Sequence, residues 1–237
     1  MKKTALILLV ALLISLTACS TKNSSGGDAY TVKFDSNGGS SVADIVTDKL
    51  TEEPKTSKEN QIFCGWYKDS ALEKPISYPF NVEKDTTLYA KWSNATENME
   101  FPDSSVQFSY DNSYNYQATY NVVPKTFDLK ALAERGYFVK IEATYDVCYE
   151  KDFDVPFDIG YLGAPDHDAY IVDPFDKGAA NEDLPTSTTP TTETISFVVS
   201  AAFLLDQNYY LKLTTYNLQN VVHFTNIKVN LTCQPTE

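Results

Sequence analysis

The strictest constraint on the fold is a run of alternating residues from Tyr137 to Val147. Apolar side chains occupy every second position of this run, and Lys140, Glu142 and other polar residues lie between them. Successive side chains of a β-strand point to opposite faces, so the run predicts a strand with one face in a core and one in water. Such a strand needs partner strands and a second layer to bury its apolar face.

Further alternating runs predict those partners. They lie at residues 106–110 and 114–122, and in a final strand that carries Ile227, Val229 and Leu231. Residues 195–205 alternate in the same way, and a turn at 206–208 followed by a run from Tyr209 to Leu213 predicts a hairpin. Only residues 128–135 predict a helix, with Asp128 as its N-cap. We therefore expect residues 101–237 to form an antiparallel β-sandwich of jelly-roll or immunoglobulin-like kind.

The first 18 residues predict an export signal. Lys2 and Lys3 form a positively charged start, and residues 5–16 (ALILLVALLISL) are almost wholly apolar. This is the layout of a secretory signal, and the apolar run is shorter than the roughly 20 residues that a membrane-spanning helix needs. The run ends in Leu-Thr-Ala-Cys at 16–19, which resembles the lipobox of bacterial lipoproteins. The resemblance implies a lipid on Cys19 that holds the exported chain at the outer face of the bacterial membrane or at the cell surface.

Residues 19–28 predict a flexible tether, because a Ser- and Gly-rich stretch buries too little surface to fold. The formal net charge of the chain is −13, and it becomes −15 without Lys2 and Lys3. Nucleic acids and anionic lipid surfaces attract clustered cations, and Arg135 is the only arginine. The composition therefore argues against both as partners.

Residues 29–93 predict a small β module. Tyr30, Val32 and Phe34 alternate along a first strand, and Asn37, Gly38 and Gly39 supply the positive φ angles of a tight turn. Residues 87–92 alternate again and predict a last strand. A polar connector at residues 94–100 is expected to separate this module from the larger domain.

Three motifs of this module resemble the Listeria-Bacteroides repeat, also called the internalin B-repeat. They are FDSNGG at 34–39, GWYKD at 65–69 and LYAKW at 88–92. The resemblance covers residues 29–92 and implies a small β-grasp-like fold of the kind found in bacterial surface proteins, as a spacer or contact module. In a module this small, Trp66 and Trp92 are expected to fill the core.

The interval from 150 to 194 is acidic and rich in proline, and it predicts a long loop excursion with an exposed low-complexity end at 185–194. Calcium takes six to eight oxygen ligands, and sandwich domains often hold it in edge loops. Asp166, Asp168 and Asp173 are the candidate ligands, although their spacing matches no EF-hand. The alternative is a solvated acidic loop, and no other cofactor is expected.

The motifs of common enzymes are missing from the sequence. There is no HExxH, no paired CxxC and no GxSxG elbow, and the two histidines, His167 and His223, lie far apart. Sequence order leaves a Ser-His-Asp triad open, but we expect no catalysis. Cys148 and Cys233 are a possible disulfide pair at the ends of two strands, with buried free thiols as the alternative.

The pattern as a whole predicts a cell-surface lipoprotein that acts as a non-catalytic binding or adhesion protein. Its partner is expected to be a host protein, a matrix protein or a glycan. The alternatives are a carbohydrate-binding lipoprotein that captures glycans, to which the sixteen tyrosines would contribute a platform, and a hydrolase.

Overall fold

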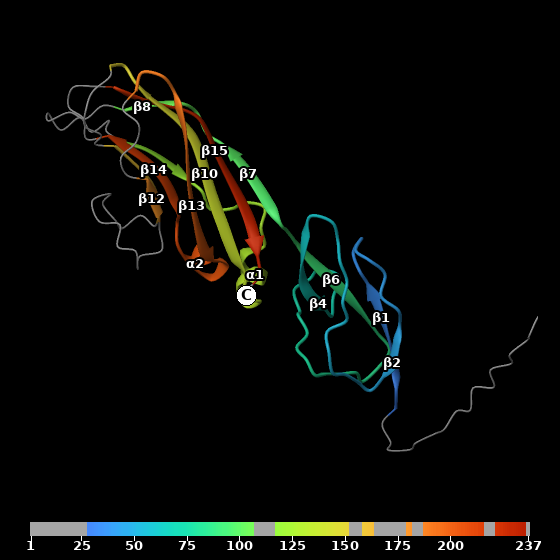
Figure 1. The fold of residues 1–237 in the computed structure, drawn as a ribbon. Helices are drawn as coiled ribbons and strands as arrows, with labels where there is room; N and C mark the ends of the chain where they lie inside the picture. The colour runs from blue at the N-terminus through green and yellow to red at the C-terminus, as the bar shows by residue number, and fades with distance from the viewer. Residues whose placement is uncertain are drawn as a thin grey trace, which may run out of the picture.

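The computed structural model describes residues 28–106, 117–151, 158–163, 179–181, 187–215 and 221–235, and within them two β units lie end to end (Figure 1). The predicted fold class is confirmed, because the structure is mainly β and the larger unit contains only antiparallel pairs among its described strands. We call residues 30–94 the module and residues 96–235 the sandwich.

The module contains a four-stranded sheet in the order β2-β1-β6-β4 and a two-stranded sheet of β3 and β5. β1 runs parallel to β6, whereas the outer strands β2 and β4 are antiparallel to their neighbours. A parallel central pair between two antiparallel edges is the arrangement of a β-grasp sheet, as predicted. The strands are β1 (Tyr30–Asp35), β2 (Ile45–Thr47), β3 (Lys49–Leu50), β4 (Gln61–Tyr67), β5 (Phe80–Asn81) and β6 (Thr86–Asn94).

Aromatic side chains fill the core of the module. Trp66 is 1% exposed, its indole N–H donates to the Pro54 carbonyl, and its ring packs edge-on against Phe34 at 4.9 Å. Trp92 packs against the same core and donates to the carbonyl of Ser36 at 2.9 Å. Both tryptophans are thus core residues, as predicted.

The turn after β1 brings backbone unusually close to this core. Asn37 and Gly38 have the positive φ angles (47° and 83°) that the sequence predicted. Gly39 follows them, and a Cβ at this position would lie 2.4 Å from Trp92 Cζ2. Only a residue without a side chain fits between the turn and the indole ring.

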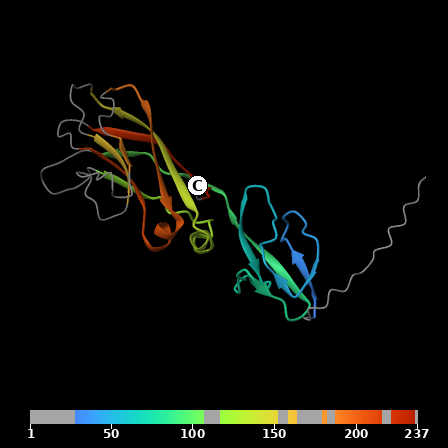
Figure 2. The same cartoon turned by 60° about the horizontal axis from the view of Figure 1, so that its bottom comes forward.

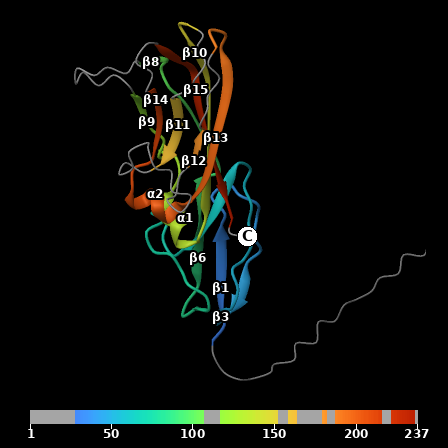
Figure 3. The same cartoon turned by 60° about the vertical axis from the view of Figure 1, so that its left-hand side comes forward.

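The sandwich has two facing sheets, which Figure 3 shows as separate layers. One has the order β13-β10-β15-β7, with β8 also paired to β15, and the other has the order β12-β11-β14-β9. Its strands are β7 (Thr96–Glu100), β8 (Ser104–Val106), β9 (Gln117–Asn121), β10 (Phe138–Tyr149), β11 (Asp158–Gly163), β12 (Ala179–Asn181), β13 (Thr191–Ser200), β14 (Tyr210–Thr215) and β15 (Val222–Gln234).

The core of the sandwich lies between these sheets. From Phe138 on, the alternating run at 137–147 lies in β10, and its residues from Val139 to Val147 on the predicted parity are at most 1% exposed. Leu162, Leu211 and Leu213 from the other sheet belong to the same cluster. Two short helices, α1 (Leu129–Glu134) and α2 (Ala201–Asp206), pack against each other at the end nearer the module (Figure 1).

Three sequence predictions about the sandwich need correction. The segment expected to be a connector forms β7, an edge strand paired with β15. The expected hairpin at 195–213 is absent, because β13 ends at Ser200, the Ser200 side chain caps α2, and β13 and β14 belong to different sheets. The excursion at 150–194 contributes β11, β12 and the start of β13.

Candidate functional site

The candidate site is the junction at which the module meets the sandwich. A nearly continuous strand crosses it, because only Ala95 separates β6 from β7. The backbone N–H of Ala95 donates to Asn60 of the module at 3.1 Å, and its carbonyl accepts from the N–H of Cys233 in the sandwich at 2.8 Å. The connecting residue is therefore hydrogen-bonded to both units.

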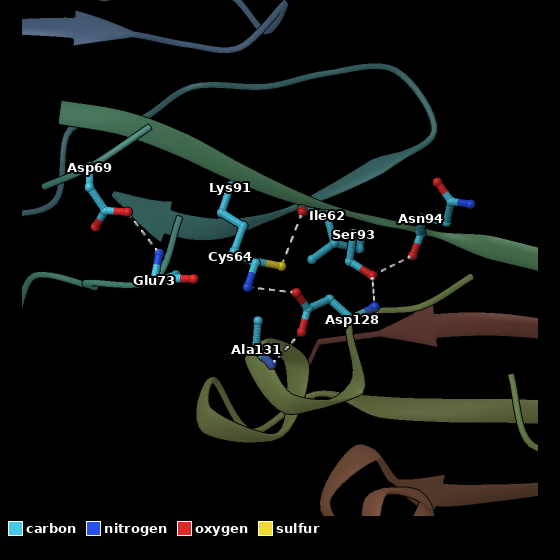
Figure 4. Close-up of polar contacts among 9 residues, drawn as sticks. All are labelled: Ile62, Cys64, Asp69, Glu73, Lys91, Ser93, Asn94, Asp128 and Ala131. Atoms are coloured by element: carbon cyan, nitrogen blue, oxygen red, sulfur yellow. Dashed lines mark hydrogen bonds and ion pairs between the residues drawn. The ribbon is translucent and has the colours of Figure 1, made fainter. Parts of the chain in front are cut away.

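An ion pair joins the last strand of the module to the first helix of the sandwich (Figure 4). Lys91 on β6 lies 2.7 Å from one carboxylate oxygen of Asp128, and the other oxygen accepts the Ala131 N–H as the predicted N-cap of α1. Ser93 is 3% exposed, and its hydroxyl accepts the Asp128 N–H at 2.9 Å. One aspartate thus fixes the start of α1 and attaches it to the module.

The environment keeps both members of this pair charged. Burial alone would raise the pKa of Asp128, but the hydrogen bonds from Lys91 and Ala131 outweigh burial and lower it below its ordinary value. Burial likewise opposes the charge of Lys91, while the hydrogen bond to Asp128 raises its pKa above the ordinary value. Both shifts favour the ionised forms at neutral pH.

A second ion pair also crosses the junction. Arg135, which follows α1, donates from both terminal nitrogens to the two carboxylate oxygens of Glu53 in the module, at 3.1 and 2.8 Å. Its guanidinium lies 5.5 Å from the centre of the Phe63 ring. Gly65 has a φ of 106°, and a Cβ there would lie 3.2 Å from the guanidinium. The planar, two-pronged contact is specific to arginine.

Apolar contacts also join the module to the sandwich. Cys64 on β4 is 5% exposed and belongs to the hydrophobic cluster of the sandwich, and Ile62 packs against that cluster. Burial, followed by the nearby charge of Asp128, raises the pKa of the Cys64 thiol to about 12. The two units therefore share part of one core.

A small pocket opens beside Lys91. It has a volume of about 250 Å³ and is lined by Tyr67, Leu72, Glu73, Pro75 and Lys91 of the module and by Lys130, Ala131 and Glu134 of α1. Its lysines and glutamates balance, so the lining favours neither anions nor cations. We assign it no ligand.

Most predicted site residues lie elsewhere. Cys19 and the proposed calcium ligands Asp166, Asp168 and Asp173 fall outside the described residues, so lipidation and calcium binding stay predictions. Among the described residues, no group of three or more His, Cys, Asp or Glu side chains is placed to hold a metal ion. Tyr110, the tyrosine that the sequence suggested as exposed for a glycan platform, also lies outside the described residues.

The possible disulfide between Cys148 and Cys233 is not formed. In the β10–β15 pair, Cys148 lies opposite His223 and Cys233 lies opposite Val139, so the two thiols are at opposite ends of the strands. The three described cysteines are free. The structure therefore shows the alternative that the sequence left open, which is free thiols. Burial raises the pKa of the Cys233 thiol to about 11.

His223 lies between two polar side chains on the outer face of the sheet. Ser105 Oγ is 2.8 Å from its Nδ1, and a Glu150 oxygen is 3.7 Å from its Nε2. Ser105 is exposed, and the Glu150 side chain is 53% exposed. Sequence order left a Ser-His-Asp triad open; the structure brings Ser105 and His223 into contact, with Glu150 rather than an aspartate 3.7 Å away.

The sequence did not predict the residues that make the junction. Asp128 was expected as an N-cap, which the structure confirms, but its second partner comes from the other unit. Glu53, Lys91 and Arg135 looked like ordinary surface charges. The one available signal was that the only arginine of an acidic chain directly precedes the glycine that ends α1.

Comparison with known families concerns the module. Residues 30–91 match the Listeria-Bacteroides repeat domain. The match covers the first two motifs that carried the resemblance in the sequence and all of the third except Trp92. Two of them reach the junction, since Gly65 belongs to GWYKD and Lys91 belongs to LYAKW.

Two proteins of Evansella cellulosilytica are similar to part of the chain. One, provisionally named a membrane protein, is 39% identical over 69 residues, which is 27% of this chain and 10% of that protein. The other, provisionally named a Gly-rich membrane protein, is 42% identical over 67 residues, which is 27% of this chain and 8% of that protein. The chain thus spans a tenth or less of the curated relatives it matches. In the described part of the chain, no helix is long and apolar enough to cross a membrane.

Proposed function

We propose that the chain is a cell-surface lipoprotein that acts as a non-catalytic binding or adhesion protein. A lipid on Cys19 holds it at the outer face of the bacterial membrane or at the cell surface, and the module positions the sandwich toward a host protein, a matrix protein or a glycan. The repeat match and the names of the two relatives support a place at a membrane or surface.

The junction is the observation that carries this proposal. A flexible linker would let the sandwich move freely, whereas Ala95, two ion pairs and a shared core join the units. Because β1 is parallel to β6 and β6 leads into the sandwich, β1 starts at the end of the module away from the sandwich (Figures 1 and 2). An anchor before β1 would therefore place the module between the membrane and the sandwich.

The partner is expected at the end of the sandwich away from the module. There the last residues of β8 and β10 lie beside the first residue of β15. In the facing sheet, the first residues of β9 and β11 lie beside the last residues of β14. The sequence between these ends, at 107–116, 152–157 and 216–220, is rich in Tyr, Asn, Ser and Asp. Binding surfaces often use such a composition.

Lipidation is tested by expression of the full chain in a bacterium fed an alkyne-bearing fatty acid. We expect the chain to carry the fatty acid and to sediment with membranes. Cys19→Ser should remove both properties, and Cys148→Ser, a thiol on the sandwich, should remove neither. An unlabelled wild-type chain would overturn the anchor.

Binding is tested with immobilised matrix proteins and glycans and the purified chain. Both labelled variants carry Cys148→Ser, because Cys148 is half-buried and lies at the same far end. A bulky maleimide on Ser105→Cys, at the far end of the sandwich, should block capture. The same group on Val46→Cys, which is exposed on the module, should leave it unchanged. Equal blocking by both would contradict a contact at the far end.

A hydrolase is the second candidate, and the contact of Ser105, His223 and Glu150 favours it. A serine within hydrogen-bond distance of a histidine is the arrangement of a nucleophile and its base. The serine contacts Nδ1 and the carboxylate lies nearer Nε2, which is the reverse of a Ser-His-Asp triad. The test is turnover of 4-nitrophenyl esters, with Ser105→Ala and His223→Gln as variants. Activity that both variants remove would establish this candidate in place of a purely binding role.

A further inference from the structure

We propose that the module is a load-bearing element whose parallel pair β1–β6 resists force in shear. The inference rests on the proposed function for the source of the force, since a surface-anchored chain that holds a partner is pulled between its tether and its sandwich. The mechanical property itself follows from strand topology and needs no lipid.

Force enters and leaves the central pair at opposite ends. The tether pulls on the start of β1, and the sandwich pulls on the end of β6 through Ala95 and β7. The two strands are parallel and in register from Val32 opposite Thr86 to Asp35 opposite Tyr89. Pulling them apart slides one along the other, so all bonds of the ladder carry the load together rather than one after another.

Side chains brace both ends of this ladder. At the start, the Thr31 N–H donates to the Asp85 carboxylate at 2.8 Å. At the end, the Asn37 side-chain amide donates to the Ala90 carbonyl at 2.6 Å, and the Trp92 indole donates to the Ser36 carbonyl at 2.9 Å. Val32 and Leu88 within the pair have no exposed surface. Buried apolar neighbours keep water from competing for the strained bonds.

The sandwich provides an internal comparison, because its outer strands are loaded differently. β7 enters it at Thr96, which lies opposite Thr232 near the end of β15. A pull on the chain terminus after β15 and on the start of β7 therefore acts at one end of an antiparallel pair. Bonds in such a pair break one at a time, starting at the loaded end.

The experiment is single-molecule pulling of residues 20–237 through handles at the two termini. The sandwich should unfold first at low force, and the smaller module should unfold second at a severalfold higher force. An extended chain adds about 3.5 Å per residue, so the sandwich releases about twice the length of the module and the events are distinguishable. The module unfolding first, or at the same force, would overturn the proposal.

Two further measurements separate shear from general stability. A handle at Val46→Cys with one at the N-terminus peels β2 from β1, because Tyr30 of β1 lies opposite Thr47 of β2. Unfolding in this geometry should need a severalfold lower force. Asp85→Ala should lower the unfolding force in the terminal geometry, and Asp44→Ala, another exposed carboxylate, should not. Equal forces in both geometries would contradict shear, whatever the outcome of the lipid test.

Discussion

Gly39 has no side chain, and this lets the turn after β1 lie directly against the aromatic core of the module. A Cβ there would overlap Trp92 Cζ2 at 2.4 Å, and the indole is held by its bond to Ser36. We expect Gly39→Ala to lower the free energy of unfolding by about 1–3 kcal/mol, as overpacked sites do. Urea denaturation measures the loss, and exposed Ser41→Ala should change stability by less than about 0.5 kcal/mol. Equal stability of the two variants would contradict the contact.

The thiols differ in their expected reactivity. Burial raises the pKa of Cys64 to about 12 and that of Cys233 to about 11, and the thiolate is the reactive form. We expect iodoacetamide at pH 8 to spare both residues in the folded chain and to modify them after unfolding in urea. Half-buried Cys148 should react first. Peptide mass spectrometry reads the sites, and early modification of Cys64 would contradict a closed junction.

At the residue scale, the sequence predicted what depends on local pattern. The turn at Asn37 and Gly38 and the buried parity of β10 were predictable, because φ preference and alternation are encoded within a few residues. The pairing of Cys148 with Cys233 could not be decided this way. It depends on the register of two strands far apart in the sequence, which only the folded sheet fixes.

Helix α1 depends on Asp128 in two ways, and two substitutions separate them. Asn is a good N-cap without a charge, so Asp128→Asn should lose the Lys91 ion pair and keep the cap. Asp128→Ala should lose both and should cost about 1 kcal/mol more. Urea denaturation at pH 7 measures both variants. A stability of Asp128→Ala equal to that of Asp128→Asn would show that the cap contributes nothing.

The ion pair also predicts a pH dependence. The pKa of Asp128 is lower in the folded chain than its ordinary value of 3.8, so its charge stabilises the fold above that value and the contribution is lost as pH falls through the folded pKa. The difference in melting temperature between wild type and Asp128→Asn should therefore shrink below pH 4. A difference that stays constant from pH 7 to pH 2.5 would contradict the ion pair.

The sequence predicted strands and helices whose residue pattern was strong. It missed those whose structure depends on a neighbouring strand or on a cap. β7 (TENME) has polar residues that rarely favour a strand, and it forms because the end of β15 offers it a ladder. Residues 201–206 alternate weakly and become α2 because the Ser200 hydroxyl accepts the Phe203 N–H. Pairing and capping outweighed the local signal in both cases.

At the scale of the whole molecule, the junction holds the two units together. The coupling free energy between Glu53 and Arg135 tests how strongly it does so. Both side chains are about 30% exposed, so their coupling should be about 0.2–1 kcal/mol. A double-mutant cycle with Glu53→Gln and Arg135→Gln gives this value from urea denaturation. The coupling should fall in 1 M NaCl, where charges are screened. A coupling of zero in low salt would mean that this pair does not hold the units together.

The division into two units was predictable, but the way they meet was not. Motifs and strand patterns each describe one unit, because they record local geometry and burial. The contacts of Lys91 with Asp128 and of Glu53 with Arg135 join residues that have no shared sequence pattern. These residues come into contact only when α1 packs against β4 and β6 in the folded chain.

Ala95 fixes the direction in which the sandwich faces. Side chains and hydrogen-bonding groups alternate along a strand, so one residue inserted between Asn94 and Thr96 would reverse every face of β7 relative to β6. The sandwich would then turn by about half a revolution about the strand axis, and α1 would leave the module. The length of the chain between the units thus sets the rotation of the sandwich: each added residue reverses it, and a second restores it.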